Sequence, residues 1–130
     1  MKKLLIDAIS TSSGGAINHL KIILNNFRKQ NYFEVVDVFL PESTKKRMPK
    51  IKNINYICPK FFLGNLFLRI IWQIFVLNLI IIKNNYHCIF VTGSSHLILA
   101  KPVVTISQNL LPFTPSEVKK YFLSFFYLKL

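Results

Sequence analysis

The stretch "LLIDAISTSSGGAINHLKIILNNF", Leu4 to Phe27, decides the fold of this 130-residue chain. It begins with a compact apolar segment, Leu4 to Ile9, which is typical of a buried strand. The small residues that follow end in Gly14 and Gly15 and indicate a loop. Beyond the loop, apolar residues recur at the spacing of one helical face: Ala16, Leu20, Ile23, Leu24 and Phe27. The stretch therefore predicts a strand, a glycine loop and a helix that starts at Ala16.

Further segments rich in β-branched and aromatic residues predict more strands. These segments are Tyr32 to Pro41, Ile54 to Cys58, Tyr86 to Gly93 and Pro102 to Ser107. The basic, proline-containing segment "ESTKKRMPKIKN" after Pro41 is expected to be an exposed connection with no element of its own.

Two helical segments are expected near the C-terminal end of the sequence. Ser94 to Lys101 is predicted to form a short helical turn. In "TPSE", Thr114 can cap a helix, Pro115 suits the first helical position and Glu117 completes a capping box. A final helix is therefore predicted from Thr114 onward.

The most hydrophobic part of the chain lies between the third and fourth predicted strands. Its apolar run, Leu66 to Ile82, has the minimum length for crossing a bilayer, but Arg69, Gln73 and Asn78 interrupt it. We interpret the run as a largely buried helix that lies on a sheet, in preference to a membrane span.

Strands that alternate with helices predict parallel pairing through right-handed crossovers. The expected fold class is therefore α/β: one Rossmann-like, doubly wound parallel sheet in a three-layer α/β/α domain. Ligands of such sheets bind at the carboxyl ends of the strands. The loops of interest are therefore Ser10 to Gly15, Gly93 to His96 and Gln108 to Phe113.

The composition is strongly basic, with 17 Lys and Arg against 5 Asp and Glu and a formal net charge of +12. This charge favours anionic partners, namely nucleic acid, acidic lipid or a phosphorylated substrate, without choosing among them. The N-terminus is basic, but its apolar run is short and contains Asp7, so a signal peptide is not indicated and a cytoplasmic location is expected.

Cysteine and carboxylate patterns exclude several kinds of chemistry. Cys58 and Cys88 are far apart and form no CxxC pair, so we expect buried thiols with no metal site and no disulfide. The five carboxylates are scattered, and no two of them suggest the acid and base of a glycoside hydrolase.

The glycine loop has two interpretations when only its own residues are considered. Gly14 and Gly15 would allow a phosphate to approach the backbone at the positive end of the following helix. However, the sequence lacks GxGxxG and GxxxxGK[ST], so a plain strand-to-helix turn is about equally favoured.

The order of segments resembles a known family. "LLIDAISTSSGGAINHLKIILNNF", "FEVVDVFLP", "IIWQIFVLNLII…YHCIFVTGSSH" and "PVVTISQNLLPFTPSE" together resemble the N-terminal half of the group 1 glycosyltransferases, family 4, of GT-B fold. The resemblance implies a retaining transfer of a sugar from a UDP- or GDP-sugar donor to a glycan or lipid-linked acceptor in polysaccharide or glycolipid biosynthesis. Such a transfer depends on stabilising the leaving diphosphate, and no further cofactor and no metal are implied.

The resemblance also implies roles for particular residues. Gly14 and Gly15 would lie under the donor diphosphate, and Gln108 and Asn109 would border the acceptor. Many relatives have a histidine in that second loop, but this chain does not, so no catalytic residue is assigned. Two histidines are further acceptor-side candidates: His96, in the loop after a predicted strand, and His19, in the first turn of the predicted helix after the glycine loop. An ordinary surface histidine is the commoner case at such positions.

The resemblance implies that residues 1–130 form only a part of the N-terminal domain of such an enzyme, and the donor-binding C-terminal domain is expected to be absent. The chain alone is therefore expected to be inactive, and a complementary C-terminal chain is an expected partner. The alternative is a non-catalytic binding module that pairs with a partner chain or an anionic membrane surface.

Two basic segments, "KKRMPKIK" and "KKYFLSFFYLKL", suggest peripheral attachment to the inner face of the cell membrane. For the second segment, burial of its apolar face inside a larger protein is about equally favoured. A nucleic-acid binder ranks last, because no helix-turn-helix, zinc or RNP-like pattern is present.

Overall fold

The computed structural model describes residues 2–30, 32–59, 66–93, 98–99 and 102–106. The elements in this part of the chain are, in order, β1 (Lys3–Asp7), α1 (Gly14–Gln30), β2 (Val35–Phe39), α2 (Glu42–Lys45), β3 (Ile54–Ile57), α3 (Leu66–Ile71), the π-helix η1 (Trp72–Leu77), α4 (Asn78–Asn84), β4 (Cys88–Val91) and β5 (Val103–Thr105). The predicted turn at 94–101, except residues 98–99, and the predicted helix from Thr114 lie outside the described residues.

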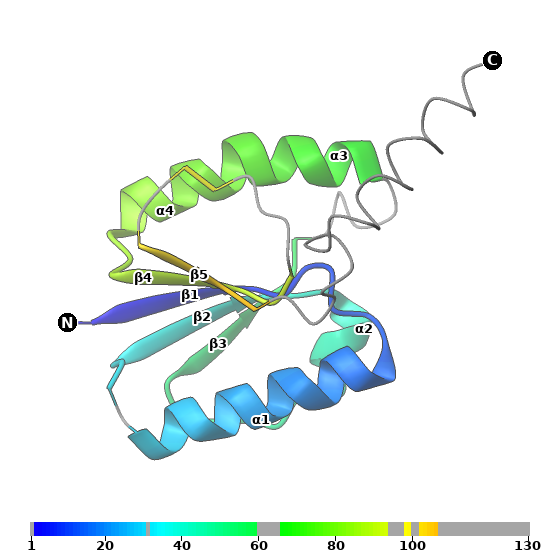
Figure 1. Ribbon diagram of the computed structural model, residues 1–130, viewed down its shortest axis with the longest axis vertical. Coiled ribbons are helices and arrows are strands. Elements are labelled where there is room, and N and C mark those ends of the chain that lie inside the picture. The colour runs from blue at the N-terminus through cyan, green and yellow to red at the C-terminus, as the bar shows by residue number, and fades with distance from the viewer. Residues whose placement is uncertain (1, 31, 60–65, 94–97, 100–101, 107–130) are drawn as a thin grey trace, which may run out of the picture.

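The strands form one parallel sheet, and the prediction of an α/β Rossmann-like fold is confirmed. Within the described residues the sheet has five strands in the order β3-β2-β1-β4-β5, and every neighbouring pair is parallel. Figure 1 shows α1 and α2 on one face of the sheet and α3 and α4 on the other. The architecture is therefore a three-layer α/β/α arrangement.

Alternation along each strand divides the core between the two faces of the sheet. In β1, Leu4 and Ile6 join the core cluster under α1, whereas Leu5 joins the cluster under η1 and α4. From the helices, Leu24 of α1 and Leu77 of η1 are fully buried against the two faces. Each such side chain stabilises the fold by roughly 1.5–3 kcal/mol relative to an exposed one.

The segment after β2 differs from the sequence prediction, because it contains the short helix α2 and is not only a connection. Thr44 explains the difference. Its side chain is 1% exposed, and its hydroxyl donates a hydrogen bond to the carbonyl of Thr11 at 2.7 Å. A tertiary hydrogen bond with a distant loop therefore stabilises a helical turn that the local composition does not indicate.

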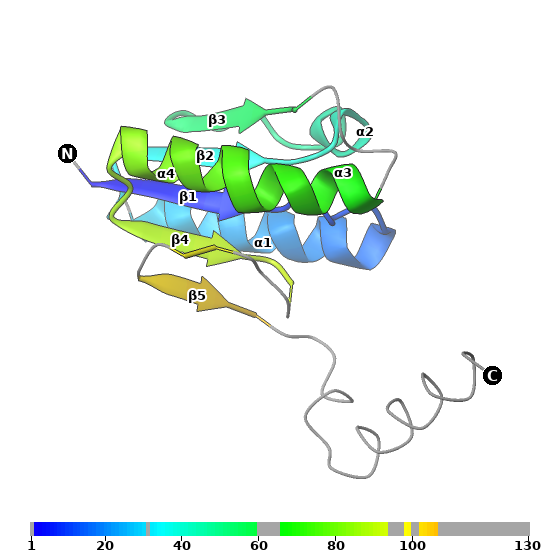
Figure 2. The same ribbon diagram turned by 90° about the horizontal axis from the view of Figure 1, so that it is seen from above.

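The hydrophobic run Leu66 to Ile82 lies on the sheet as predicted, but its description as largely buried is wrong. Trp72 and Ile81 are buried against the sheet, whereas Phe75 and Leu79 on the outer side are 62% and 65% exposed. Figure 2 shows α3 and α4 in line along this face. Among the described residues, no helix has the length and apolar character needed to cross a bilayer.

The two cysteines are free, as expected, but they are only partly buried, which corrects the prediction of buried thiols. They lie on strands or strand ends at the α1 face, where neither is fully covered. Partial burial and then the nearby Glu42 carboxylate raise the pKa of the Cys58 thiol. Partial burial also raises the pKa of Cys88. Both thiols are therefore less reactive than a free cysteine.

Candidate functional site

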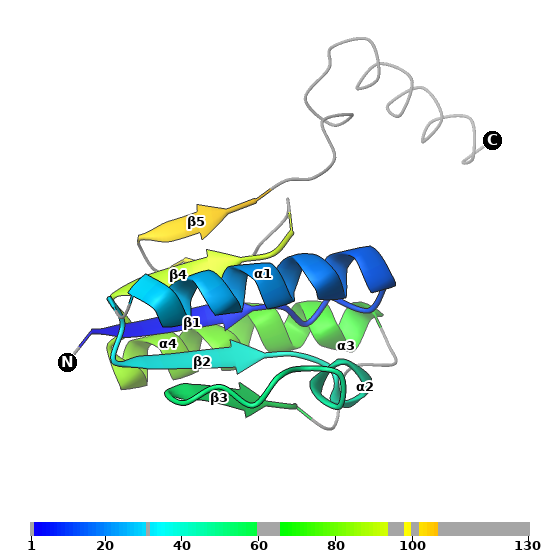
Figure 3. The ribbon, with the colours of Figure 1, turned by 90° about the horizontal axis from the view of Figure 1, so that it is seen from below.

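The strand order creates a switch point between β1 and β4. From β1 the chain moves to one side of the sheet through β2 and β3, and it then returns to the other side of β1 to form β4 and β5. The connection after β1 leads to α1 on one face of the sheet, whereas Ile98, which follows β4, packs in the core of the opposite face. In doubly wound sheets ligands bind outside the carboxyl ends of the strands, at such a switch point. Figure 3 shows the start of α1 and the short helix α2 at this edge of the sheet.

Hydrogen bonds connect the two loops at the switch point. The backbone N–H of Thr92, the residue after β4, donates to the carbonyl of Asp7 at the end of β1, at 3.1 Å. The hydroxyls of Thr11 and Thr92 are 3.1 Å apart, and the Thr92 hydroxyl donates to the same Asp7 carbonyl at 3.2 Å. A Cβ placed on Gly93 would lie 3.8 Å from the Ser10 hydroxyl. The loop after β1 and the residues after β4 therefore form one surface.

A buried carboxylate lies beneath this surface. Asp7 is only 3% exposed. Its carboxylate accepts hydrogen bonds from the backbone N–H of Ile9 at 3.2 Å and from the side-chain amide of Gln73 at 3.0 Å. Gln73 belongs to η1, so the irregular helix reaches the end of β1 directly. The Asp7 carboxylate thus fixes the first residues of the loop against the helix layer.

The π-helix itself is held by another buried polar residue. The Asn78 amide donates to the carbonyls of Gln73 at 3.0 Å and Ile74 at 2.8 Å. Its oxygen accepts the N–H of Leu99 at 2.9 Å. π turns inside α-helices are rare and frequently occur at functional sites. Here the π turn presents Gln73 to the strand end.

Gly14 and Gly15 form the start of α1, two residues earlier than the predicted start at Ala16. The Ser13 carbonyl accepts the first helical hydrogen bond, from the Ile17 N–H at 3.0 Å, so the N–H groups of the first turn have no partner within the helix. The first turn contains no acidic residue. Its positive dipole end is therefore available to an anion.

The fold itself does not require glycine at these two positions. Neither glycine has a positive φ, and a Cβ on either one would meet no atom within 4 Å. A turn that needed glycine would show strain or a close contact at one of the two. The open space above both residues is instead what a ligand approaching the backbone requires.

A run of cations follows the residue of α2 that contacts the loop. Lys45, Lys46 and Arg47 follow directly after Thr44, whose hydroxyl binds the loop carbonyl of Thr11. All three are exposed. They belong to the basic segment that the sequence suggested as a membrane contact, but the structure places them beside the carboxyl edge of the sheet, where they attract an anionic ligand.

Of the other predicted site residues, the structure places only His19. Because α1 begins at Gly14, His19 lies in the second helical turn and not the first, where it is half-buried. His96, Gln108 and Asn109 lie outside the described residues.

Sequence reasoning missed Asp7, Thr11, Gln73 and Thr92 as contributors to the site. A carboxylate in an otherwise apolar strand and an amide in an apolar helix were the available signals, because such groups are rarely buried unless they are hydrogen-bonded. The two threonines gave no signal in the sequence.

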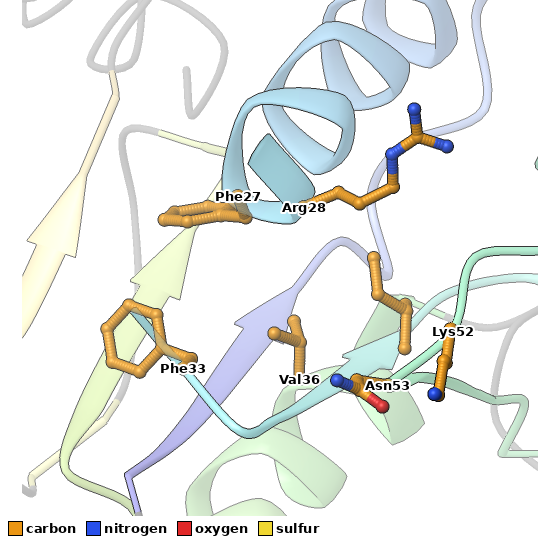
Figure 4. A pocket seen from close by; sticks show the side chains of 7 residues that line it. Phe27, Arg28, Phe33, Val36, Lys52 and Asn53 are labelled. Atoms are coloured by element: carbon orange, nitrogen blue, oxygen red, sulfur yellow. The ribbon is translucent and has the colours of Figure 1, made fainter. Parts of the chain in front are cut away.

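A hollow of about 170 Å³ lies at the opposite end of the sheet, between the end of α1 and the beginnings of β2 and β3. Phe27, Phe33 and Val36 give it an apolar lining, and the charged ends of Arg28 and Lys52 point away from each other (Figure 4). It therefore has no convergent polar groups and lies at the wrong edge of the sheet for the site.

Within the part of the chain that the structure describes, no three His, Cys, Asp or Glu side chains are arranged to hold a metal ion. Comparisons with protein-family models, with curated proteins and with solved structures found no match for this chain. The switch-point geometry is therefore the main guide to function.

Proposed function

We propose that the chain is the acceptor-side domain of a group 1 glycosyltransferase of GT-B fold. In this proposal the backbone of Gly14 and Gly15 lies under the diphosphate of a UDP- or GDP-sugar, and the acceptor is a glycan or a lipid-linked glycan. Most of the donor contacts would come from a complementary donor-binding domain. The chain alone is then a binding domain and not a complete enzyme.

The observation that supports the proposal most is the open glycine pair at the switch point. Gly14 and Gly15 stand at the positive end of a 17-residue helix, with free space above them and with exposed cations on the neighbouring α2 segment. This combination suits the two negative charges of a diphosphate. The buried Asp7–Gln73 hydrogen bond at 3.0 Å holds the base of the loop and so reduces the cost of ordering it on binding.

An NMR titration of the chain with UDP and with GDP tests the proposal. We expect amide shifts confined to residues 10–15 and 92–93. The Gly14→Val variant should weaken them, whereas Asn18→Val, an exposed position further along α1, should not. Shifts that centre on the hollow near Phe27 and Lys52, or no saturable shift with either nucleotide, would refute the proposal.

The alternative proposal is a non-catalytic binding module, and the exposed apolar side of the α3–α4 layer favours it. The two proposals differ in the role of the loop. If Gly14→Val leaves every measurable binding activity intact, the module is favoured over the transferase domain.

A further inference from the structure

The outer side of the helical segment Leu66–Asn84 carries an apolar stripe, which we define as Phe67, Phe75, Leu79 and Ile82. These four side chains are 66%, 62%, 65% and 69% exposed, respectively. Leu99 is also 83% exposed, and its N–H donates to Asn78 of the same helical segment at 2.9 Å. Solvent-exposed apolar residues that are grouped in this way mark an interaction surface.

The π turn brings the stripe into line. In a regular α-helix, Phe67 and Phe75 would be separated by about 2.2 turns and would point in different directions. With η1 between them, the eight residues amount to about two turns, since a π turn takes about one residue more than an α turn. Phe67 therefore comes into line with Phe75, Leu79 and Ile82.

The charges near the stripe are of one sign. The sequence contains no Asp or Glu between Glu42 and Glu117, so α3, η1, α4, β4 and β5 contribute no carboxylate. Lys83 adjoins Ile82 at the end of α4 and is exposed. These elements therefore present no carboxylate to a negatively charged partner, and the formal net charge of +12 attracts it over a longer range.

We propose that the apolar stripe docks on an anionic lipid bilayer, with the α3–α4 helix parallel to the membrane surface. Four large side chains can enter the boundary between headgroups and acyl chains while the rest of the domain stays in water. A second copy of the chain fits less well, because two chains of charge +12 repel each other. The proposal does not depend on sugar transfer, because it uses a different face and different residues from the glycine loop.

Flotation of the full chain with vesicles tests this surface. We expect binding to vesicles of phosphatidylcholine with phosphatidylglycerol, and little binding to phosphatidylcholine alone. The double variant Phe75→Gln/Leu79→Gln should bind at least about ten-fold more weakly. The matched control, Ile22→Gln, changes a residue on α1 that is 59% exposed on the opposite face, and it should bind like the original protein.

A gain of signal provides a second measurement that does not depend on loss of binding. Tryptophan in a Phe75→Trp variant should shift its emission to shorter wavelength when anionic vesicles are added, and tryptophan in Ile22→Trp should not. The proposal is overturned if the double variant binds vesicles normally, or if Lys45→Ala/Lys46→Ala abolishes binding while the double variant does not. The proposal is also overturned if the original chain forms a dimer, the double variant is a monomer, and neither protein binds vesicles. UDP binding is unaffected by these results, so the two proposals can fail separately.

Discussion

Replacing both loop glycines with alanine separates a structural role from a ligand role. Gly14 and Gly15 have no positive φ, and an added Cβ on either would meet no atom within 4 Å. Alanine reduces the conformational freedom of the unfolded chain, which stabilises a compatible site by roughly 0.4–1 kcal/mol. The free energy of unfolding of the Gly14→Ala/Gly15→Ala variant should therefore be about 1–2 kcal/mol higher than that of the original protein.

The same change should weaken binding of a nucleoside diphosphate. The two methyl groups would occupy the space through which a diphosphate approaches the first-turn N–H groups. Loss of one hydrogen bond to a charged group costs roughly 1.5–3 kcal/mol, so we expect Kd for UDP to rise by about 10- to 150-fold. Stability and affinity are thus expected to change in opposite directions.

Urea unfolding followed by circular dichroism measures the stability, and an NMR titration with UDP measures the affinity. The control variant Asn25→Ala/Asn26→Ala changes two exposed residues of α1 and should also raise stability, through helix propensity, with no effect on UDP. If the glycine variant loses more than about 1 kcal/mol of stability, the two glycines are structurally required and the reasoning is refuted. If the variant is stable and binds UDP normally, the loop is not a diphosphate site.

Two further perturbations test the site and the sheet. Asp7→Ala removes the acceptor of the Ile9 N–H and the Gln73 amide and should lower the free energy of unfolding by about 1–3 kcal/mol. Asp7→Asn keeps one oxygen for the Ile9 N–H and should lower it by less. Equal losses of the two variants in urea unfolding would contradict this role of the carboxylate. Burial, and then the hydrogen bond to Asp37, raise the pKa of the Tyr86 phenol. The protonated phenol therefore stabilises the fold fully at pH values below the usual tyrosine pKa of about 10. This stabilisation is lost as the pH rises through the higher pKa of the folded state. The unfolding free energy measured from pH 9 to 11 should therefore fall less steeply in Tyr86→Phe than in the original protein, and an identical slope would show that Tyr86 has no such effect.

The elements of this fold could be predicted from the sequence because their signals are local. Apolar residues at helical spacing in α1 and β-branched runs in β1, β2 and β4 require only neighbouring positions to be read. The glycine loop was also found in this way. The helix α2 was not, because a hydrogen bond of the buried Thr44 to the distant Thr11 stabilises it. The exposure of the outer side of the α3–α4 layer could not be predicted either. The segment carries apolar residues on all sides, so its composition does not indicate which side faces the sheet.

The sequence by itself determined the order of the strands, the two long helical segments between them and the position of Gly14 and Gly15 after the first strand. Only the tertiary structure decided that β4 lies beside β1, so that Thr92 meets Thr11 across 81 positions of the sequence. It also brought Gln73 to Asp7, 66 positions away. Hydrophobic periodicity acts over a few residues, whereas these contacts depend on strand order and on the π turn, which only the packing of the whole sheet determines.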